Sequence, residues 1–228
     1  MIQPSKKISP AFTLTELLVV IAIVGGLAAL LMPAVKSASL SAKSAKAISN
    51  LKQTGIIVGS YAADNGNRLP LSMYWPSQFT FQKILRSYSK ELQAMPIYKS
   101  VQTDLPEIFF DPVLKGKKEH SYGSFGVNSA VVFDNNKVGG PDGVGMAFAI
   151  IASPSQKVIY CSAIEPGVAG TWGFNGNAYV EKGFDPTYGP DPRHGGKAVA
   201  LFADGHVEKL DVKNMDEATR RRHFTLDP

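Results

Sequence analysis

The sequence predicts an α+β protein, in which a long N-terminal helix carries a head built around an antiparallel sheet. The first observation is an apolar segment at residues 12–33, and the second is a helical pattern that continues over residues 34–63. The third is a series of short β-rich segments within residues 64–228, separated by loops rich in glycine and proline. This order of elements is typical of an α+β head on a helical stalk.

The composition indicates a globular chain with an appendage. Of its 228 residues, 44% are hydrophobic and 19% are charged, which excludes a disordered chain. The single cysteine, Cys161, excludes an internal disulfide framework and a multi-cysteine zinc site. The formal charge is +5, and loss of Lys6 and Lys7 with a leader would lower it by two, to +3. A charge this small does not indicate a nucleic acid partner.

The apolar segment has the length of a membrane span. Phe12 to Met32 is 21 residues with one charged side chain, Glu16. At about 1.5 Å per residue it would reach roughly 31 Å, close to the thickness of a bilayer core. Lys6 and Lys7 place the short N-terminal side in the cytoplasm and the head outside it. A cleaved secretory signal needs a shorter apolar stretch, and a plain signal anchor leaves Glu16 unexplained.

A carboxylate near the start of a membrane helix is costly unless it is paired. If the chain is cut between Ala11 and Phe12, the new α-amine lies one helical turn from Glu16. The amine of the same chain or of a neighbour could then pair with this carboxylate and align subunits. Small residues further along, including Gly25 and Gly26, would let such helices approach closely.

A short basic leader followed by FTLTELLVVIAIVGGLAALLMPAV resembles the N-terminal methylation motif of type IV pilins and type II secretion pseudopilins. Phe12, Glu16 and Pro33 match three positions of that motif; Ala11 stands where the family prefers Gly, and Thr15 where it prefers an apolar residue. The resemblance implies that residues 1–11 are a leader removed by a prepilin peptidase, which also methylates Phe12. It further implies a single-pass bacterial inner-membrane protein with a periplasmic head, which assembles with sister subunits through an inner-membrane platform.

The stalk is predicted to pack on the head through one face. Apolar or small residues recur at spacings of three and four, whereas Lys43, Lys46, Asn50 and Gln53 are expected on other faces. The stripe comprises Ile48, Leu51, Gly55, Val58 and Ala62. Pro33 removes one backbone hydrogen bond, so a kink or local melting is expected there. Asp64-Asn65-Gly66-Asn67 should end the helix, with Gly66 in a left-handed conformation.

Residues 77–94 of the head are predicted to form one short helix. Strands are expected at residues 122–127, 147–151, 157–163, 197–203 and 206–210. The last two should form a hairpin, with Asp204 and Gly205 as a type I′ turn.

A second resemblance involves the C-terminal motif. His194, nine intervening residues, then Asp204-Gly205 are similar to the signature of a large bacterial group of prepilin-like proteins. Residues 61–66 also resemble the junction after the stalk in that group. Many members carry a mid-chain Cys-Pro pair where this chain has Asp111-Pro112, so no role tied to that cysteine is expected.

Two interpretations of His194 remain open. In one, His194 is structural, bonded to the turn so that it fixes the register of the hairpin. In the other, His194, Asp204 and His206 converge to bind a metal or to catalyse a reaction. Calcium, held by Asp185, Asp191 and Asp204, is a further candidate.

The leading functional hypothesis is a non-enzymatic filament subunit, a type II secretion pseudopilin, whose head contacts sister subunits or secreted cargo. The alternative is a membrane-anchored periplasmic metal-binding or enzymatic module that uses His194, Asp204 and His206. A third class, a minor pilin that binds DNA, would use Arg220–Arg222.

Overall fold

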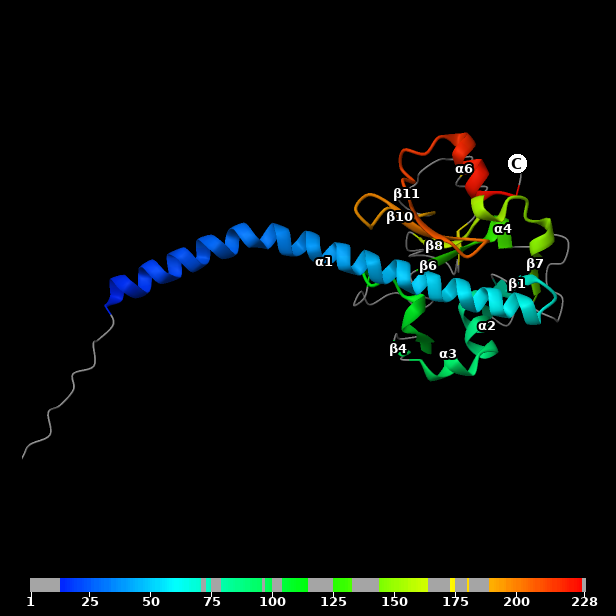
Figure 1. Cartoon of the computed structure of the whole chain (residues 1–228), viewed down its shortest axis with the longest axis horizontal. Coiled ribbons are helices and arrows are strands. Elements are labelled where there is room, and N and C mark those ends of the chain that lie inside the picture. The colour runs from blue at the N-terminus through cyan, green and yellow to red at the C-terminus, as the bar shows by residue number, and fades with distance from the viewer. Residues whose placement is uncertain are drawn as a thin grey trace, which may run out of the picture. The chain divides into compact units, whose positions relative to one another are not determined.

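The computed structural model describes residues 13–70, 73–74, 79–95, 97–99, 104–114, 125–132, 144–163, 173–174, 180 and 189–226. The chain divides into two compact units, Met1–Ser39 and Leu40–Pro228, which we treat separately. We call the second unit the head. Figure 1 shows its elements, which confirm the predicted α+β class.

The N-terminal helix, α1, is continuous from Leu14 to Asp64 and therefore begins in the first unit and ends in the second. It passes through Pro33 without a break in its helical assignment, so the local melting considered for this residue is not seen; the kink remains a prediction. The predicted stop signal is confirmed. Gly66 and Asn67 take φ values of 66° and 57°, and Asn67 N–H donates to the Ala62 carbonyl at 2.7 Å, as in a Schellman motif.

The part of α1 within the head buries the predicted face. Leu51, Val58 and Ala62 are no more than 2% exposed, and Ile48 packs against the core from a partly buried position. Asn50, which was expected on a face other than the packing stripe, is also buried: it is 2% exposed and donates to the Phe110 carbonyl at 3.1 Å. The buried face is wider than the predicted stripe and includes polar residues that find partners.

The main sheet of the head has five strands in the order β11-β10-β8-β6-β9. All its pairs are antiparallel except β6 with β9, which is parallel. The strands are β6 (Phe125–Asn128), β8 (Val158–Ser162), β9 (Gly173–Phe174), β10 (Ala198–Phe202) and β11 (Val207–Leu210). Three of the predicted strands are therefore confirmed, at β8, β10 and β11, and β6 overlaps a fourth.

The prediction of a strand at residues 147–151 is wrong. A strand, β7 (Val144–Ala147), ends where that segment begins, and a 3₁₀ turn, η2 (Phe148–Ile150), follows. Strand β7 pairs with β1 (Arg68–Pro70) beside the end of α1. Gly145 permits this approach, since a Cβ there would lie 2.7 Å from the Leu69 carbonyl oxygen.

The predicted single helix over residues 77–94 is two helices, α2 (Phe81–Tyr88) and α3 (Lys90–Ala94). Ser89 separates them because its extended backbone and side chain form the N-cap of α3. Helix α2 packs on the core through Phe81 and Leu85, which are fully buried. The remaining elements are two small hairpins, β2 (Met73–Tyr74) with β3 (Phe79–Thr80) and β4 (Ile97–Lys99) with β5 (Asp104–Pro106), and the short helices η1 (Glu107–Phe109), α4 (Ser129–Val132), η3 (Pro154–Gln156) and α6 (Glu217–Phe224).

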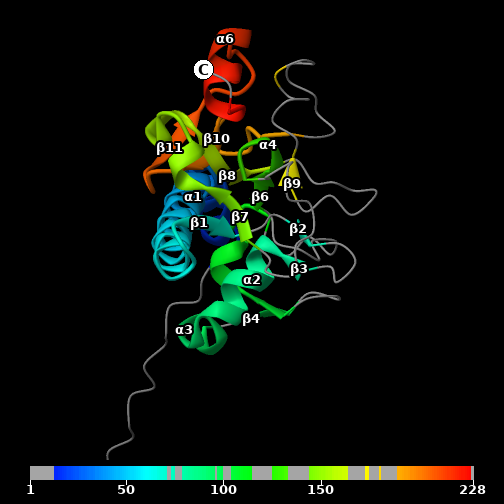
Figure 2. The ribbon, with the colours of Figure 1, turned by 90° about the vertical axis from the view of Figure 1, so that its right-hand side faces the viewer.

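The head has helices on both faces of the main sheet. Figures 1 and 2 show the second part of α1 between the sheet and the α2–α3 pair, with α6 on the far face. One apolar cluster, which includes Leu51, Phe81 and Tyr160, fills the α1 side. A second, which includes Phe202, Leu210 and Phe224, lies under α6.

Residues 203–206 connect β10 to β11, and the predicted type I′ turn at Asp204 and Gly205 is wrong. Such a turn needs positive φ at two residues, but only Gly205 in this loop has it, at 91°. Phe202 N–H donates to the His206 carbonyl and Gly205 N–H donates to the Phe202 carbonyl. The loop packs on α1, where a Cβ on Gly55 would lie 2.9 Å from Leu201 Cδ1 and 3.4 Å from the Gly205 oxygen.

Candidate functional site

The first candidate site is the N-terminal end of α1, where Thr13 and Glu16 form a capping box. Glu16 Oε2 accepts from Thr13 N–H at 2.9 Å and from the Thr13 hydroxyl at 2.7 Å. In return Glu16 N–H donates to Thr13 Oγ1 at 3.3 Å. The pair satisfies two backbone donors that the start of a helix leaves unpaired, and it places a carboxylate at the positive end of the helix dipole.

The first unit exposes apolar side chains all around α1. From Leu14 to Val35 its large hydrophobic residues are 49% to 80% exposed. Among the described residues, α1 is the one helix long and apolar enough to cross a membrane, judged by length and composition. Gly25 and Gly26 leave open space on its surface, because a Cβ at either would meet no atom within 4 Å.

The expected processing residues, Ala11 and Phe12, lie outside the described residues, as does the proposed leader. α1 begins at Leu14, two residues after Phe12. A cut at the predicted bond would therefore fall just before the helix and leave both members of the capping box in the mature chain.

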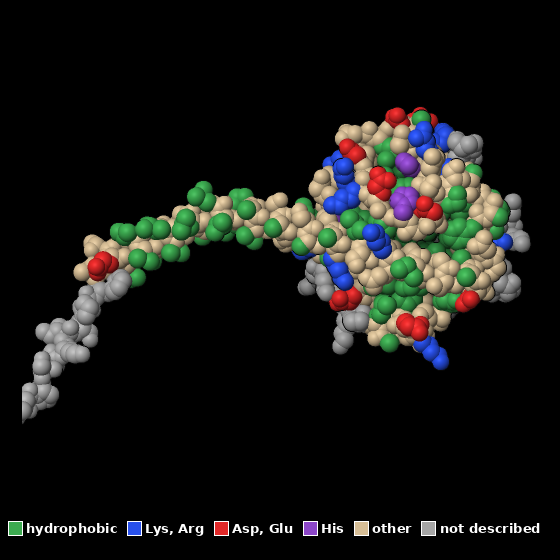
Figure 3. Space-filling model, viewed as in Figure 1, with side chains coloured by type: hydrophobic (Ala, Val, Ile, Leu, Met, Phe, Trp, Pro, Cys, Tyr) green, Lys and Arg blue, Asp and Glu red, His purple; other side chains and the backbone are tan. Residues whose placement is uncertain are grey.

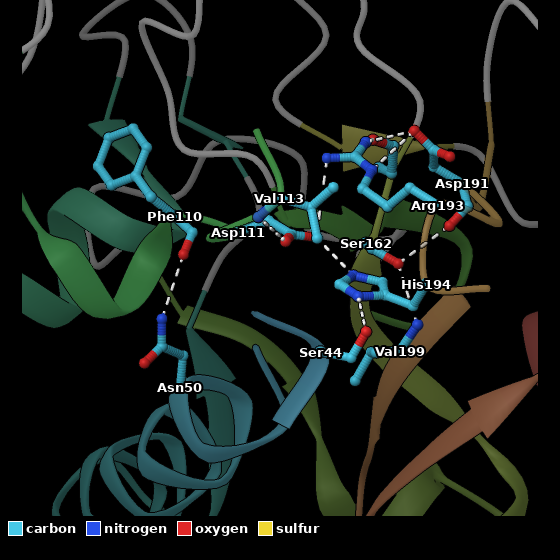
Figure 4. Close-up of polar contacts among 11 residues, drawn as sticks. Ser44, Asn50, Phe110, Asp111, Val113, Ser162, Asp191, Arg193, His194 and Val199 are labelled. Carbon is cyan, nitrogen blue, oxygen red and sulfur yellow. Dashed lines mark hydrogen bonds and ion pairs between the residues drawn. The ribbon is translucent and has the colours of Figure 1, made fainter. Parts of the chain in front are cut away.

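The second candidate site is a buried polar cluster around His194, shown in Figure 4. His194 Nδ1 lies 3.0 Å from the hydroxyl of Ser44 on α1, and Nε2 lies 2.7 Å from Asp111 Oδ2. The Asp111 carboxylate accepts, so Nε2 carries the hydrogen and a neutral ring accepts the Ser44 hydroxyl at Nδ1. Ser44, Asp111 and His194 are each no more than 3% exposed.

Arg193 extends the cluster toward the sheet. Its Nη2 lies 2.5 Å from Asp191 Oδ2 and also donates to the Ala163 carbonyl, while Nη1 lies 3.8 Å from Asp111 Oδ2. Ser162 on β8 accepts from Val199 N–H and donates to the Asp191 carbonyl. These bonds connect α1, the segment after η1, β8 and the loop before β10.

The predicted convergence of His194 with Asp204 and His206 is wrong. His194 turns toward α1, whereas Asp204 and His206 pair with each other at 2.5 Å on an exposed part of the head. The idea that His194 bonds the hairpin turn also needs correction, since its side-chain partners are Ser44 and Asp111. The reason is that Gly195 and Gly196, at φ values of 71° and 87°, reverse the chain before β10.

The calcium hypothesis is not tested by this geometry. Asp185 lies outside the described residues, Asp191 is paired with Arg193, and Asp204 with His206. Within the described ranges no group of three or more His, Cys, Asp or Glu side chains is placed to hold a metal ion.

Sequence reasoning missed Ser44 and Asp111 as members of this cluster. Asp111 had a signal, because Asp111-Pro112 occupies the position of the Cys-Pro pair that the resemblance pointed to. Ser44 had none, since serine is frequent in this part of the stalk.

The geometry of the cluster fits a structural role, in which its bonds stabilise the packing of α1 on the rest of the head. Its serine, histidine and carboxylate are arranged in a chain, but burial of all three keeps a substrate from reaching the Ser44 hydroxyl. Cys161 is also buried, and burial raises the pKa of its thiol well above the usual range, so it is not a reactive thiolate.

Comparison with protein-family models, curated proteins and solved structures finds no match to this chain.

Proposed function

We propose that this protein is a pilin-like filament subunit of the pseudopilin class, processed by a prepilin peptidase between Ala11 and Phe12. The observation that carries the proposal is the part of α1 that lies in the first unit. This part is apolar on every side and has one carboxylate, Glu16, at its start. A helix that is hydrophobic all round needs an apolar environment, either lipid or other helices. In Figure 3 hydrophobic side chains line this segment and acidic atoms lie near its beginning.

The capping box gives Glu16 a role in assembly. Before the cut, the carboxylate is held by Thr13 of its own chain. A cut before Phe12 would add a positive α-amine at the helix N-terminus, where the helix dipole disfavours positive charge. Glu16 would then be the nearest compensating charge, in its own subunit or an adjacent one. A low-dielectric filament core strengthens such a pair.

The head supports the same proposal. A long helix packed on an antiparallel sheet is compatible with a pilin-like fold. The Ser44–His194–Asp111 cluster joins α1 to the head within the second unit, so that a force on the helix would be passed to the sheet. The head would be periplasmic, with sister subunits, the assembly platform and secreted cargo as partners.

The test is incorporation of Glu16 variants into filaments in cells that supply a prepilin peptidase and an assembly platform. Glu16→Gln keeps the size of the side chain and some capping but removes the charge. We expect it to reach the membrane and be processed, but to be depleted at least tenfold from the sheared filament fraction. Thr15→Ala, on the neighbouring position, is the control and should assemble normally. Equal incorporation of Glu16→Gln and the wild type would contradict the role given to Glu16.

A further inference from the structure

Two histidines, separate from the buried cluster, pack on the side chain of Phe202 at the end of the final hairpin. The ring of His206 stacks on Phe202 with centroids 4.1 Å apart and planes 13° apart. The ring of His223, on α6, meets Phe202 edge-on at 5.6 Å. Both imidazoles therefore lie against one aromatic ring, although 17 positions separate them in the sequence. Figure 3 shows histidine side chains beside acidic ones on this face of the head.

Each of these histidines has its Nδ1 atom fixed by an acceptor. His223 Nδ1 lies 2.8 Å from the carbonyl oxygen of Gln156, which can only accept. His206 Nδ1 lies 2.5 Å from Asp204 Oδ1. In the neutral rings Nδ1 therefore carries the hydrogen, and the lone pair is at Nε2. A carboxylate or carbonyl behind Nδ1 is the usual outer-shell support of a metal-binding histidine.

We propose that His206 and His223 bind one borderline transition-metal ion, Zn²⁺ or Cu²⁺, through their Nε2 atoms. Imidazole nitrogen is a preferred ligand of both ions. The side chain of His206 is 41% exposed, and the buried Phe202 contacts both imidazole rings. Water completes the coordination, because no third His, Cys, Asp or Glu in the described part of the chain joins them. Asp204 is a positioning residue that orients His206.

The experiment is calorimetric titration of the full chain in detergent micelles with ZnCl₂. We compare the wild type with His206→Ala, His223→Ala and the double variant. If the two rings share one ion, each single variant weakens binding at least tenfold and the double variant is no weaker than either. His120 and His194 are present in all four proteins, so their contribution cancels. Glu208→Gln, an exposed change two residues from His206, is the control and should bind as the wild type.

A second measurement separates a shared site from independent imidazoles. The electron paramagnetic resonance spectrum of bound Cu²⁺ should show two nitrogen ligands in the wild type and one in His206→Ala. Asp204→Asn should keep both nitrogens and weaken binding by about 10- to 100-fold, the usual effect of removing an outer-shell carboxylate.

The proposal is overturned if each single variant halves the stoichiometry at unchanged affinity, or if the wild type binds no more tightly than the double variant. His223→Gln and the far-ultraviolet spectrum of each variant check that α6 remains folded.

Discussion

His194 Nε2 lies 2.7 Å from Asp111 Oδ2, and both side chains are fully buried although 83 positions separate them in the sequence. The other nitrogen of the same ring meets Ser44 on α1 at 3.0 Å. A single imidazole therefore connects the stalk part of the helix to the segment after η1. The His194 ring thus links the C-terminal motif to α1.

Loss of Asp111 should unfold this part of the head at lower denaturant concentration. Asp111→Ala removes a carboxylate that both His194 and Arg193 face, and loss of a hydrogen bond to a charged group costs about 1.5–3 kcal/mol. Ser44→Ala removes one neutral bond and should cost about 0.5–1.5 kcal/mol. Urea unfolding of the full chain in micelles, followed by tryptophan fluorescence, gives both values.

A double-mutant cycle with Asp111→Asn and His194→Gln then measures the pairwise coupling free energy. Effects of the two changes that simply add would show that the residues do not interact, contrary to the structure.

Two glycines of α1 should respond oppositely to alanine. At Gly55 a Cβ would lie 2.9 Å from Leu201 Cδ1 and press on the final hairpin, while at Gly59 it would meet nothing within 4 Å. Gly59→Ala should raise the free energy of unfolding by up to about 1 kcal/mol through helix propensity. The free energy of unfolding of Gly55→Ala should be about 1–3 kcal/mol lower than that of Gly59→Ala, because the added methyl group overpacks the contact with the hairpin. Thermal unfolding of both variants checks this, and equal stabilisation by both would show that the hairpin does not rest on Gly55.

Tyr88 should ionise at a higher pH than an ordinary tyrosine. Its hydroxyl donates to the Asp64 carboxylate, and this bond, with burial and the nearby charge adding to it, raises the pKa of Tyr88 to about 12. A raised pKa means that the folded state favours the neutral phenol. The stabilisation of the folded state by the neutral Tyr88 phenol is fully present below pH 10 and is lost as the pH rises through about 12. Absorbance at 295 nm should show a late titration step that Tyr88→Phe removes, and its persistence in that variant would contradict the assignment.

Bulky residues at the open glycines of the first unit should block assembly and leave the head intact. A Cβ at Gly25 or Gly26 would meet no atom within 4 Å in the single chain, so Gly25→Ile and Gly26→Ile should leave the urea midpoint of the protein unchanged. Close helix approach in an apolar environment depends on small residues, so incorporation into filaments should fall severalfold. Val24→Ile adds one methylene next to them and serves as the control. Normal incorporation of both glycine variants would mean that these residues are not in a helix contact.

Much of the fold could be predicted because its signals are local. The apolar run, the stripe containing Leu51 and Val58, and the stop at Gly66 each follow from neighbouring residues. The break at Ser89 and the strand boundary at Ala147 were not predicted, because capping and backbone pairing compete with the apolar pattern there. The turn type at Asp204-Gly205 depended on which residues take positive φ, and the Asp-Gly pair does not specify that Gly205 alone does so.

The site was predicted less completely. Glu16 stands out because a charge in an apolar run is visible in sequence. The partners of His194 do not stand out in the sequence. Ser44 and Asp111 lie 150 and 83 positions away from His194 and contact it only in the folded head. The position of His223 against Phe202 could not be predicted, because it depends on the packing of α6 on the sheet.

The most direct test of the proposed function is the intact mass and N-terminal analysis of the protein from membranes of cells that contain a prepilin peptidase. The account predicts a chain that begins at N-methylated Phe12, with residues 1–11 removed and Glu16 retained next to the new amine. A chain that still begins at Met1 in those membranes would contradict the account, and the protein would then be a simple anchored domain.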